Sequence, residues 1–193
     1  MLNEQTLQTL NALKLFGMAR SFADKIAHPC AADLSHPEFF GLIVQDEKTY
    51  RDNLRLKRLL LNAKLTQPAC LENIDYKHPR GLNKQTILEL SSPDWITRHH
   101  TVLLTGPTGV GKTGLACGLL LKALQNGLRC QFIRAQDLFD EMYASLADRS
   151  TRKLVNRLAR LDILLIDEFG YVNLKPEQSN IFFKLMEERY HQH

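Results

Sequence analysis

The first 65 residues carry apolar side chains at about every third or fourth position, the spacing of one face of an α-helix. His28-Pro29 interrupts this pattern, and a second helix is expected to begin near Pro37, because proline is favoured in the first turn of a helix. The sequence therefore predicts an all-helical region over residues 1–65. Its apolar positions are Leu7, Leu10, Leu13, Met18, Phe22 and Ile26 in the first stretch, and Phe40, Ile43, Tyr50, Leu54 and Leu61 in the second.

The pattern changes after this region. Residues 66–85 contain two prolines and a glycine and lack a periodic apolar face, so a linker is expected there. Over residues 86–193, short apolar runs alternate with helical patterns, which predicts an α/β fold with a parallel sheet covered by helices. The expected strands span about 101–105, 130–134 and 161–166, and the expected helices span about 112–126, 136–147 and 150–160.

A glycine-rich loop follows the first expected strand and opens the next helix. It fits the phosphate-binding pattern GxxxxGK[ST], and its strand–loop–helix context argues against a glycine-rich turn without a ligand. Glycines let backbone N–H groups turn toward a phosphate, and the helix N-terminus adds its positive end. Lys112 is expected to reach the β- and γ-phosphates of a nucleoside triphosphate, and Thr113 to place its hydroxyl on Mg²⁺. The loop comprises Gly106, Pro107, Thr108, Gly109, Val110, Gly111, Lys112 and Thr113.

An acidic pair, Asp167-Glu168, ends the apolar run of residues 161–166. A wholly apolar strand suits a parallel sheet covered on both faces, and ligands bind such sheets at the carboxyl ends of their strands. Asp167 is therefore expected to hold Mg²⁺ through water, and Glu168 to polarise an attacking water molecule. The alternative is that the pair only ends the strand or caps the next segment. ATP and Mg²⁺ are the predicted ligands, and Lys112 and Glu168 the predicted catalytic residues.

Two sets of basic residues recur at helical spacing. The first set suits phosphate contacts along a nucleic-acid backbone, although a solvated helix face is the competing interpretation. The second set could bind nucleic acid, contact a neighbouring subunit or cover the sheet edge, and the sequence leaves these open. The first set is Lys48, Arg51, Arg55 and Arg58, and the second is Arg149, Lys153, Arg157 and Arg160.

The composition is that of a globular domain with an extension: 193 residues, 44% hydrophobic and 24% charged. A net charge of +4 permits a polyanionic partner without requiring one. No apolar run reaches the length of a membrane span, and the first residues lack a signal peptide, so a cytoplasmic protein without a membrane partner is expected. The scattered cysteines predict reduced thiols rather than a zinc site. They are Cys30, Cys70, Cys117 and Cys130.

Several segments together resemble a known family, the IstB-like helper ATPases of insertion sequences, which are relatives of the DnaC-type helicase loaders in the AAA+ class. The resemblance covers essentially the whole chain and rests on "LNALKLFGMARSF", "DWITRHHTVLLTGPTGVGKT" and "LLIDEFGYVNLKPEQSNIFFKLMEERY". It implies an ATP-dependent homo-oligomer that binds double-stranded DNA, selects or remodels the target, and stimulates a partner transposase. It also implies a phosphate loop and an acidic pair made of Gly106, Gly109, Gly111, Lys112, Thr113, Asp167 and Glu168.

The chain departs from the family pattern at two places. Thr108 and Val110 stand where family loops often have Pro and Thr, and neither position supplies an essential group. The family pattern continues beyond "FFKLMEERYHQH" to a strand with a polar sensor residue and a helix that supplies an arginine to the neighbouring subunit, so a chain shortened at its carboxyl end is expected. Whether it hydrolyses ATP is therefore left open. The alternatives are a helicase loader that holds another protein through residues 1–65, and an ATP-switched DNA-binding module with little hydrolysis.

Overall fold

The computed structural model describes residues 2–27, 34–67, 71, 74–76, 81–171 and 173–192. The chain forms two compact units, Met1–Arg58 and Leu59–His193. The boundary between the units lies inside a long helix, α3 (His36–Ala63). Among the described residues, no helix is both long enough and apolar enough to cross a membrane.

The first unit is helical, as its apolar periodicity predicts, but the first expected helix is two helices. α1 (Leu2–Ala12) and α2 (Phe16–Ala27) are separated by a turn in which Lys14 has a left-handed φ of 58°. The Lys14 and Leu15 amides donate to the carbonyls of Asn11 and Leu10, which is the hydrogen-bond pattern of a Schellman helix end. Because lysine stands where glycine is usual, the sequence alone does not predict that a helix ends here.

α3 begins at His36 with Pro37 in its first turn, as predicted, while the break expected at His28-Pro29 lies outside the described residues. α2 and α3 approach closely at Gly17, where a Cβ atom would lie 2.8 Å from the Cα of Glu47. Ala19 of α2 and Ile43 of α3 are buried. Glycine at this crossing therefore lets the two helix backbones approach each other.

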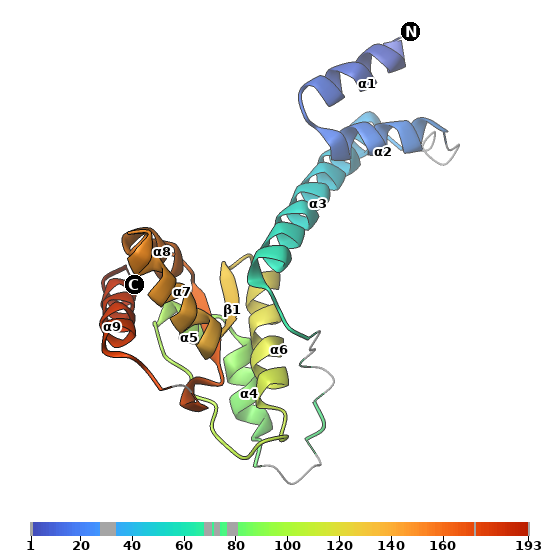
Figure 1. Cartoon of the computed structure of the whole chain (residues 1–193). Coiled ribbons are helices and arrows are strands. Elements are labelled where there is room, and N and C mark those ends of the chain that lie inside the picture. Colours follow the sequence, from blue (N-terminus) through green and yellow to red (C-terminus); the bar gives the residue numbers. More distant parts are fainter. Residues whose placement is uncertain are drawn as a thin grey trace. The chain divides into compact units, whose positions relative to one another are not determined.

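The second unit is built on a two-stranded parallel sheet. β1 (Cys130–Arg134) pairs with β2 (Ile163–Asp167), and Arg134 lies opposite Asp167 at the carboxyl ends. Figure 1 shows α6 (Lys112–Gln125) on one side of β1, with α7 (Ala135–Ala147), α8 (Thr151–Ala159) and α9 (Pro176–Gln192) on the other. The remaining elements of this unit precede α6 or follow β2. They are the helices α4 (Lys84–Ser91) and α5 (Asp94–Thr97), which precede α6, and a 3₁₀ turn, η3 (Phe169–Tyr171), which follows β2.

The main core of this unit lies between the sheet and helices α7 to α9. Arg189 of α9 completes this layer by donating to the carbonyl oxygens of Leu158 and Leu161 at 3.0 and 2.7 Å. Leu158 lies in the last turn of α8 and Leu161 follows the helix, so these contacts tie α9 to the end of α8. The buried side chains of the core are Ile133, Ala135, Leu138, Phe139, Met142, Leu154, Val155, Leu158, Ala159, Ile181 and Leu185.

The mixed α/β fold with its parallel sheet is confirmed, with one element corrected. Residues 101–105 form no strand: within the described part of the chain, the sheet contains only β1 and β2. Leu103 is 83% exposed, although it lies in the apolar run that predicted a buried strand. An apolar run predicts burial, but a strand also needs a partner backbone within about 5 Å, which the run does not specify.

The stretch expected as a linker contributes side chains to a second apolar cluster. Leu71, Ile74, Tyr76 and Leu82 pack around Ile87, Leu115 and Leu119, so this part of the stretch lies against α4 and α6. At Gly118 of α6, a Cβ atom would lie 2.8 Å from Leu71 Cδ2. A glycine inside α6 thus leaves room for the leucine.

Candidate nucleotide-binding site

The glycine-rich loop connects residues 101–105 to α6. Gly111 is the N-cap of α6, with φ 90° and ψ 21°, and Gly109 also has a positive φ of 85°. A side chain in the left-handed region costs roughly 1–2 kcal/mol, so the loop conformation requires the glycines that the motif specifies. No side chain caps the N-terminus of α6. Its first N–H groups and the positive end of its dipole therefore suit an anion.

The Lys112 side chain contacts the start of the glycine-rich loop. Its ammonium group donates to the carbonyl oxygens of Gly106 at 2.9 Å and Pro107 at 2.7 Å. Both acceptors are neutral, whereas a phosphate oxygen carries charge and forms a stronger hydrogen bond with an ammonium group. The lysine is thus already positioned at the loop and can exchange carbonyl partners for phosphate.

Thr113 and Asp167 bring the two sequence motifs together. The Thr113 hydroxyl, in the first turn of α6, donates to Asp167 Oδ2 at 2.9 Å across 54 positions of sequence. A hydroxyl and a carboxylate are the hard oxygen ligands that Mg²⁺ prefers. No group of three or more His, Cys, Asp or Glu side chains suited to a metal occurs among the described residues. Two oxygen ligands fit an ion that takes its other ligands from water and phosphate.

Glu168 follows Asp167 in an uncommon backbone conformation. Its φ is 58°, its side chain is exposed, and its N–H donates to Asp167 Oδ1 at 3.1 Å. Its carbonyl accepts the Tyr171 N–H at 3.2 Å, so the chain turns sharply at the end of β2. A non-glycine residue held in this region is uncommon, and such strain clusters at functional sites.

Two features of the site carry no clear signal in the sequence. Tyr171, three residues after Glu168, places its hydroxyl 3.5 Å from the Thr108 Oγ1 of the loop. A cavity of ≈ 200 Å³ adjoins the loop, and its lining comes from the expected linker, from residues 103–105, and from the loop and the start of α6. Nothing in the local sequence links Tyr171 to the loop or Leu82 to the cavity. The cavity is lined by Leu82, Leu103, Leu104, Thr105, Val110, Gly111, Lys112 and Leu115.

Cys117 and Cys130, the cysteines in the described part of the chain, are free and buried, whereas Cys30 and Cys70 lie outside it. Burial raises the pKa of the Cys117 thiol, and the negative charge of Asp167 adds to this rise. Burial likewise raises the pKa of Cys130 to about 12, with a contribution from Asp162. Both groups therefore remain neutral thiols at neutral pH, which fits the expected reduced state.

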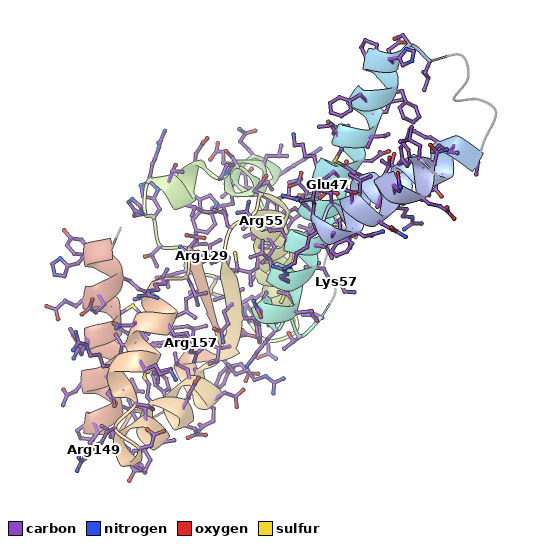
Figure 2. The ribbon with its side chains drawn as sticks, turned by 90° about the horizontal axis from the view of Figure 1, so that it is seen from above. Glu47, Arg55, Lys57, Arg129, Arg149 and Arg157 are labelled. Atoms are coloured by element: carbon purple, nitrogen blue, oxygen red, sulfur yellow. The ribbon has the colours of Figure 1, made fainter. Side chains whose placement is uncertain are left out.

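The first basic set lies on α3, but its members differ in environment. Arg51 Nε donates to Glu47 Oε1 at 2.7 Å, and Glu47 Oε2 accepts the Met18 N–H at 2.9 Å. Arg51 therefore supports the α2–α3 contact through Glu47, although all four basic side chains are exposed. Figure 2 labels both Glu47 and Arg55 on α3.

The second basic set does not form one continuous helix face, which corrects the sequence interpretation. Arg149 precedes α8 with a left-handed φ of 57°, and Arg160 is the C-cap that follows the helix. Arg157 donates to the side chains of Gln131 and Glu141, which ties α8 to β1 and α7. Figure 2 shows Arg149 well separated from Arg157.

The parallel sheet, the glycine loop at the start of α6 and the acid-ended strand β2 define a P-loop NTPase domain. The family described as IstB-like ATP binding protein matches residues 8–193. The chain belongs to this family, and the resemblance predicted from the sequence is confirmed.

Individual relatives agree with this assignment. The chain is 36% identical over 190 residues to a Pseudomonas fluorescens protein described as an ATP-binding protein of insertion sequence IS1162, covering 98% of this chain and 82% of the relative. It is 33% identical to the y4pL insertion-sequence protein of Sinorhizobium fredii, covering 98% and 78%. Identity to the IS21 ATP-binding protein of Pseudomonas aeruginosa is 27%, covering 94% and 68%.

Proposed function

We propose that this chain binds ATP with Mg²⁺ at the glycine loop, hydrolyses it, and acts on double-stranded DNA as the helper ATPase of an insertion sequence. The observation that carries the proposal is the 2.9 Å hydrogen bond between Thr113 and Asp167. It joins the end of the phosphate loop to the end of the acidic strand, so the groups for phosphate binding and for metal binding lie at one place.

Each residue of the site then has a role in phosphoryl transfer. Lys112 leaves the carbonyls of Gly106 and Pro107 and binds the β- and γ-phosphates, while loop N–H groups hold the remaining oxygens. Thr113 and Asp167 would hold Mg²⁺, which would neutralise charge on the phosphate oxygens. Glu168 orients the attacking water and accepts its proton.

The cavity beside the loop is proposed to receive the base. It lies next to Gly111 and Lys112, and the apolar side chains of Leu82 and Leu115 form part of its lining. A flat aromatic ring fits such a surface, since small-molecule sites are lined mostly by apolar side chains with a few polar groups. Leu82 belongs to the segment before the phosphate loop, so base binding would hold this segment against α6.

The proposal for DNA rests on the exposed basic face of α3 and on the insertion-sequence relatives. Lys48, Arg55 and Arg58 project one sign of charge from a single helix, which suits sequence-independent phosphate contacts. A partner transposase and assembly into a homo-oligomer are proposed on the same family grounds.

The direct experiment is ATP turnover by the purified chain, with Mg²⁺, in the presence and absence of duplex DNA. We expect turnover that rises with DNA and is lost in Lys112→Ala. Nucleotide binding without turnover in either condition would contradict the hydrolytic role and favour an ATP-switched DNA-binding module. Failure of the chain to bind nucleotide at all would contradict the proposed site.

A further inference from the structure

The short turn that follows Glu168 is anchored at its first residue by aromatic packing. The ring of Phe169 lies 6.0 Å from that of Phe139 in α7 and 5.5 Å from that of Phe182 in α9, measured between ring centroids. Aromatic pairs at such separations stabilise each other beyond the area they bury. The start of η3 is therefore attached to the core of the second unit.

The last residue of the turn, Tyr171, faces a different element. Its hydroxyl lies 3.5 Å from Thr108 Oγ1 in the glycine loop, 63 positions earlier in the sequence. Its amide donates to the Glu168 carbonyl at 3.2 Å. The residue is 83% exposed, so burial of its ring gives little reason for this placement. Tyr171 thus touches the phosphate loop through its side chain and Glu168 through its backbone.

We infer that Tyr171 is a positioning residue that couples the phosphate loop to the direction of the Glu168 carboxylate. This inference rests on the proposed hydrolysis of ATP. Glu168 is held at φ 58°, a conformation that persists only when neighbouring contacts maintain it. Phe169 fixes the turn on the core side, and Tyr171 fixes it on the loop side. A change of the loop at Thr108 on phosphate binding is thereby transmitted to the residue that orients water.

The chemistry of this coupling is hydrogen bonding between two hydroxyl groups, either of which can donate. The two oxygens lie 3.5 Å apart, which is longer than a typical O–H···O hydrogen bond. Because catalytic hydrogen bonds often shorten when substrate binds, the contact is expected to tighten with ATP in the loop. Removing either hydroxyl then removes the same interaction.

The kinetic test compares Tyr171→Phe, Thr108→Val and the double variant. Each single change is expected to lower kcat by a few-fold to about tenfold, the range for one neutral hydrogen bond, with little change in ATP affinity. The double variant should lose no more than either single variant, because both remove one contact. Tyr190→Phe is the matched control: this tyrosine is 82% exposed on α9 and lies outside the loop. An unchanged kcat in Tyr171→Phe, or effects that multiply in the double variant, overturns the inference.

A second measurement needs no nucleotide and separates this inference from the proposed function. The rate of hydrogen exchange at the amide of residue 171 reports how stable its hydrogen bond to the Glu168 carbonyl is, and therefore how well the turn is maintained. Tyr171→Phe and Thr108→Val should accelerate this exchange by the same factor, and Tyr190→Phe should leave it unchanged. Unchanged exchange in the first two variants overturns the inference even when the chain hydrolyses no ATP. Absence of turnover with accelerated exchange contradicts the proposed hydrolysis alone.

Discussion

Glu47 and Arg51 form an ion pair one helical turn apart on α3, with Arg51 Nε 2.7 Å from Glu47 Oε1. Glu47 is only 7% exposed, and its second oxygen accepts the Met18 N–H near the start of α2. The arginine therefore neutralises a carboxylate that holds two helices together. Arg51, which is predicted to contact DNA, thus also has a structural role that does not depend on DNA.

This difference within the basic face predicts separate effects on DNA affinity and on stability. Arg55→Ala with Arg58→Ala should reduce the slope of log affinity against log salt by roughly 1.8, since each duplex phosphate contact contributes about 0.9. Alanine is a good helix former, so α3 should persist. Arg51→Ala should instead lower the free energy of unfolding by about 1 kcal/mol or less, because its side chain is largely exposed.

Salt titrations of duplex binding and urea unfolding curves give the two measurements. Lys57→Ala is the control, because Lys57 is also exposed on α3 but projects from another side of the helix. The DNA proposal for this face is wrong if the Arg55 and Arg58 double variant keeps the parent slope.

Acid should weaken the α2–α3 contact through Asp46 and Glu47. Hydrogen bonds from Lys25, and then from Ser21, lower the pKa of Asp46. Burial pushes the pKa of Glu47 upward, but the Met18 amide and Arg51 outweigh it, so its pKa is also lowered. A lowered carboxyl pKa contributes stability that is complete above the ordinary value near pH 4 and is lost as the pH falls through the lowered value.

Urea unfolding at pH 7 and pH 3, followed by helical circular dichroism, checks this expectation. Asp46→Asn should be less stable than the parent at pH 7, and the difference should shrink at pH 3. Asp52→Asn, which changes an exposed carboxylate on the same helix, serves as the control. A stability difference for Asp46→Asn that is equal at both pH values would show that the ionised form contributes nothing.

Lys112→Ala should abolish ATP binding at micromolar nucleotide and leave the fold intact. The side chain is half-buried, and its hydrogen bonds go to loop carbonyls rather than into the core, so its removal costs little packing. Fluorescent-nucleotide titration with circular dichroism gives both readings. Lys122→Ala, in the last turn of the same helix, should bind nucleotide as the parent does. Equal ATP affinity in Lys112→Ala and the parent would contradict the proposal that the glycine-rich loop binds the phosphates.

Glu168→Gln should preserve nucleotide binding and reduce hydrolysis by about 10²-fold or more, the usual effect of losing a general base. The amide keeps the size and hydrogen bonding of the side chain but cannot accept the proton. Single-turnover hydrolysis at saturating ATP isolates this step. The control is Glu177→Gln, which removes an exposed carboxylate in the first turn of α9. Full activity in Glu168→Gln would favour the alternative that the acidic pair only ends the strand or caps the next segment.

The sequence predicts this fold best where the pattern is local. The strand expected at 130–134 coincides with β1, and the helix expected at 136–147 differs from α7 by one residue, because each has a continuous periodic pattern. The strand predicted for residues 101–105 was wrong, because strand pairing depends on a partner elsewhere in the chain. The helix end at Lys14 was missed because only backbone conformation distinguishes it from helix interior.

The candidate site was predictable in its residues but not in its supporting contacts. Thr113 and Asp167 lie together as their positions at the ends of α6 and β2 predicted, although their roles in binding remain predictions. The Glu47–Arg51 pair could have been found from its four-residue spacing. The contact between Tyr171 and Thr108 could not, because it joins two loops 63 positions apart.

The glycine loop and the acidic strand are proposed to form one site for ATP with Mg²⁺, and every role proposed for Lys112, Thr113, Asp167 and Glu168 depends on this. The most direct test is the affinity for ATP with and without Mg²⁺, measured for the parent and for Asp167→Ala. We predict that Mg²⁺ tightens ATP binding to the parent, and that Asp167→Ala loses most of this gain while keeping the metal-free affinity set by Lys112 and the loop. A variant that retains the full gain from Mg²⁺ would contradict the claim.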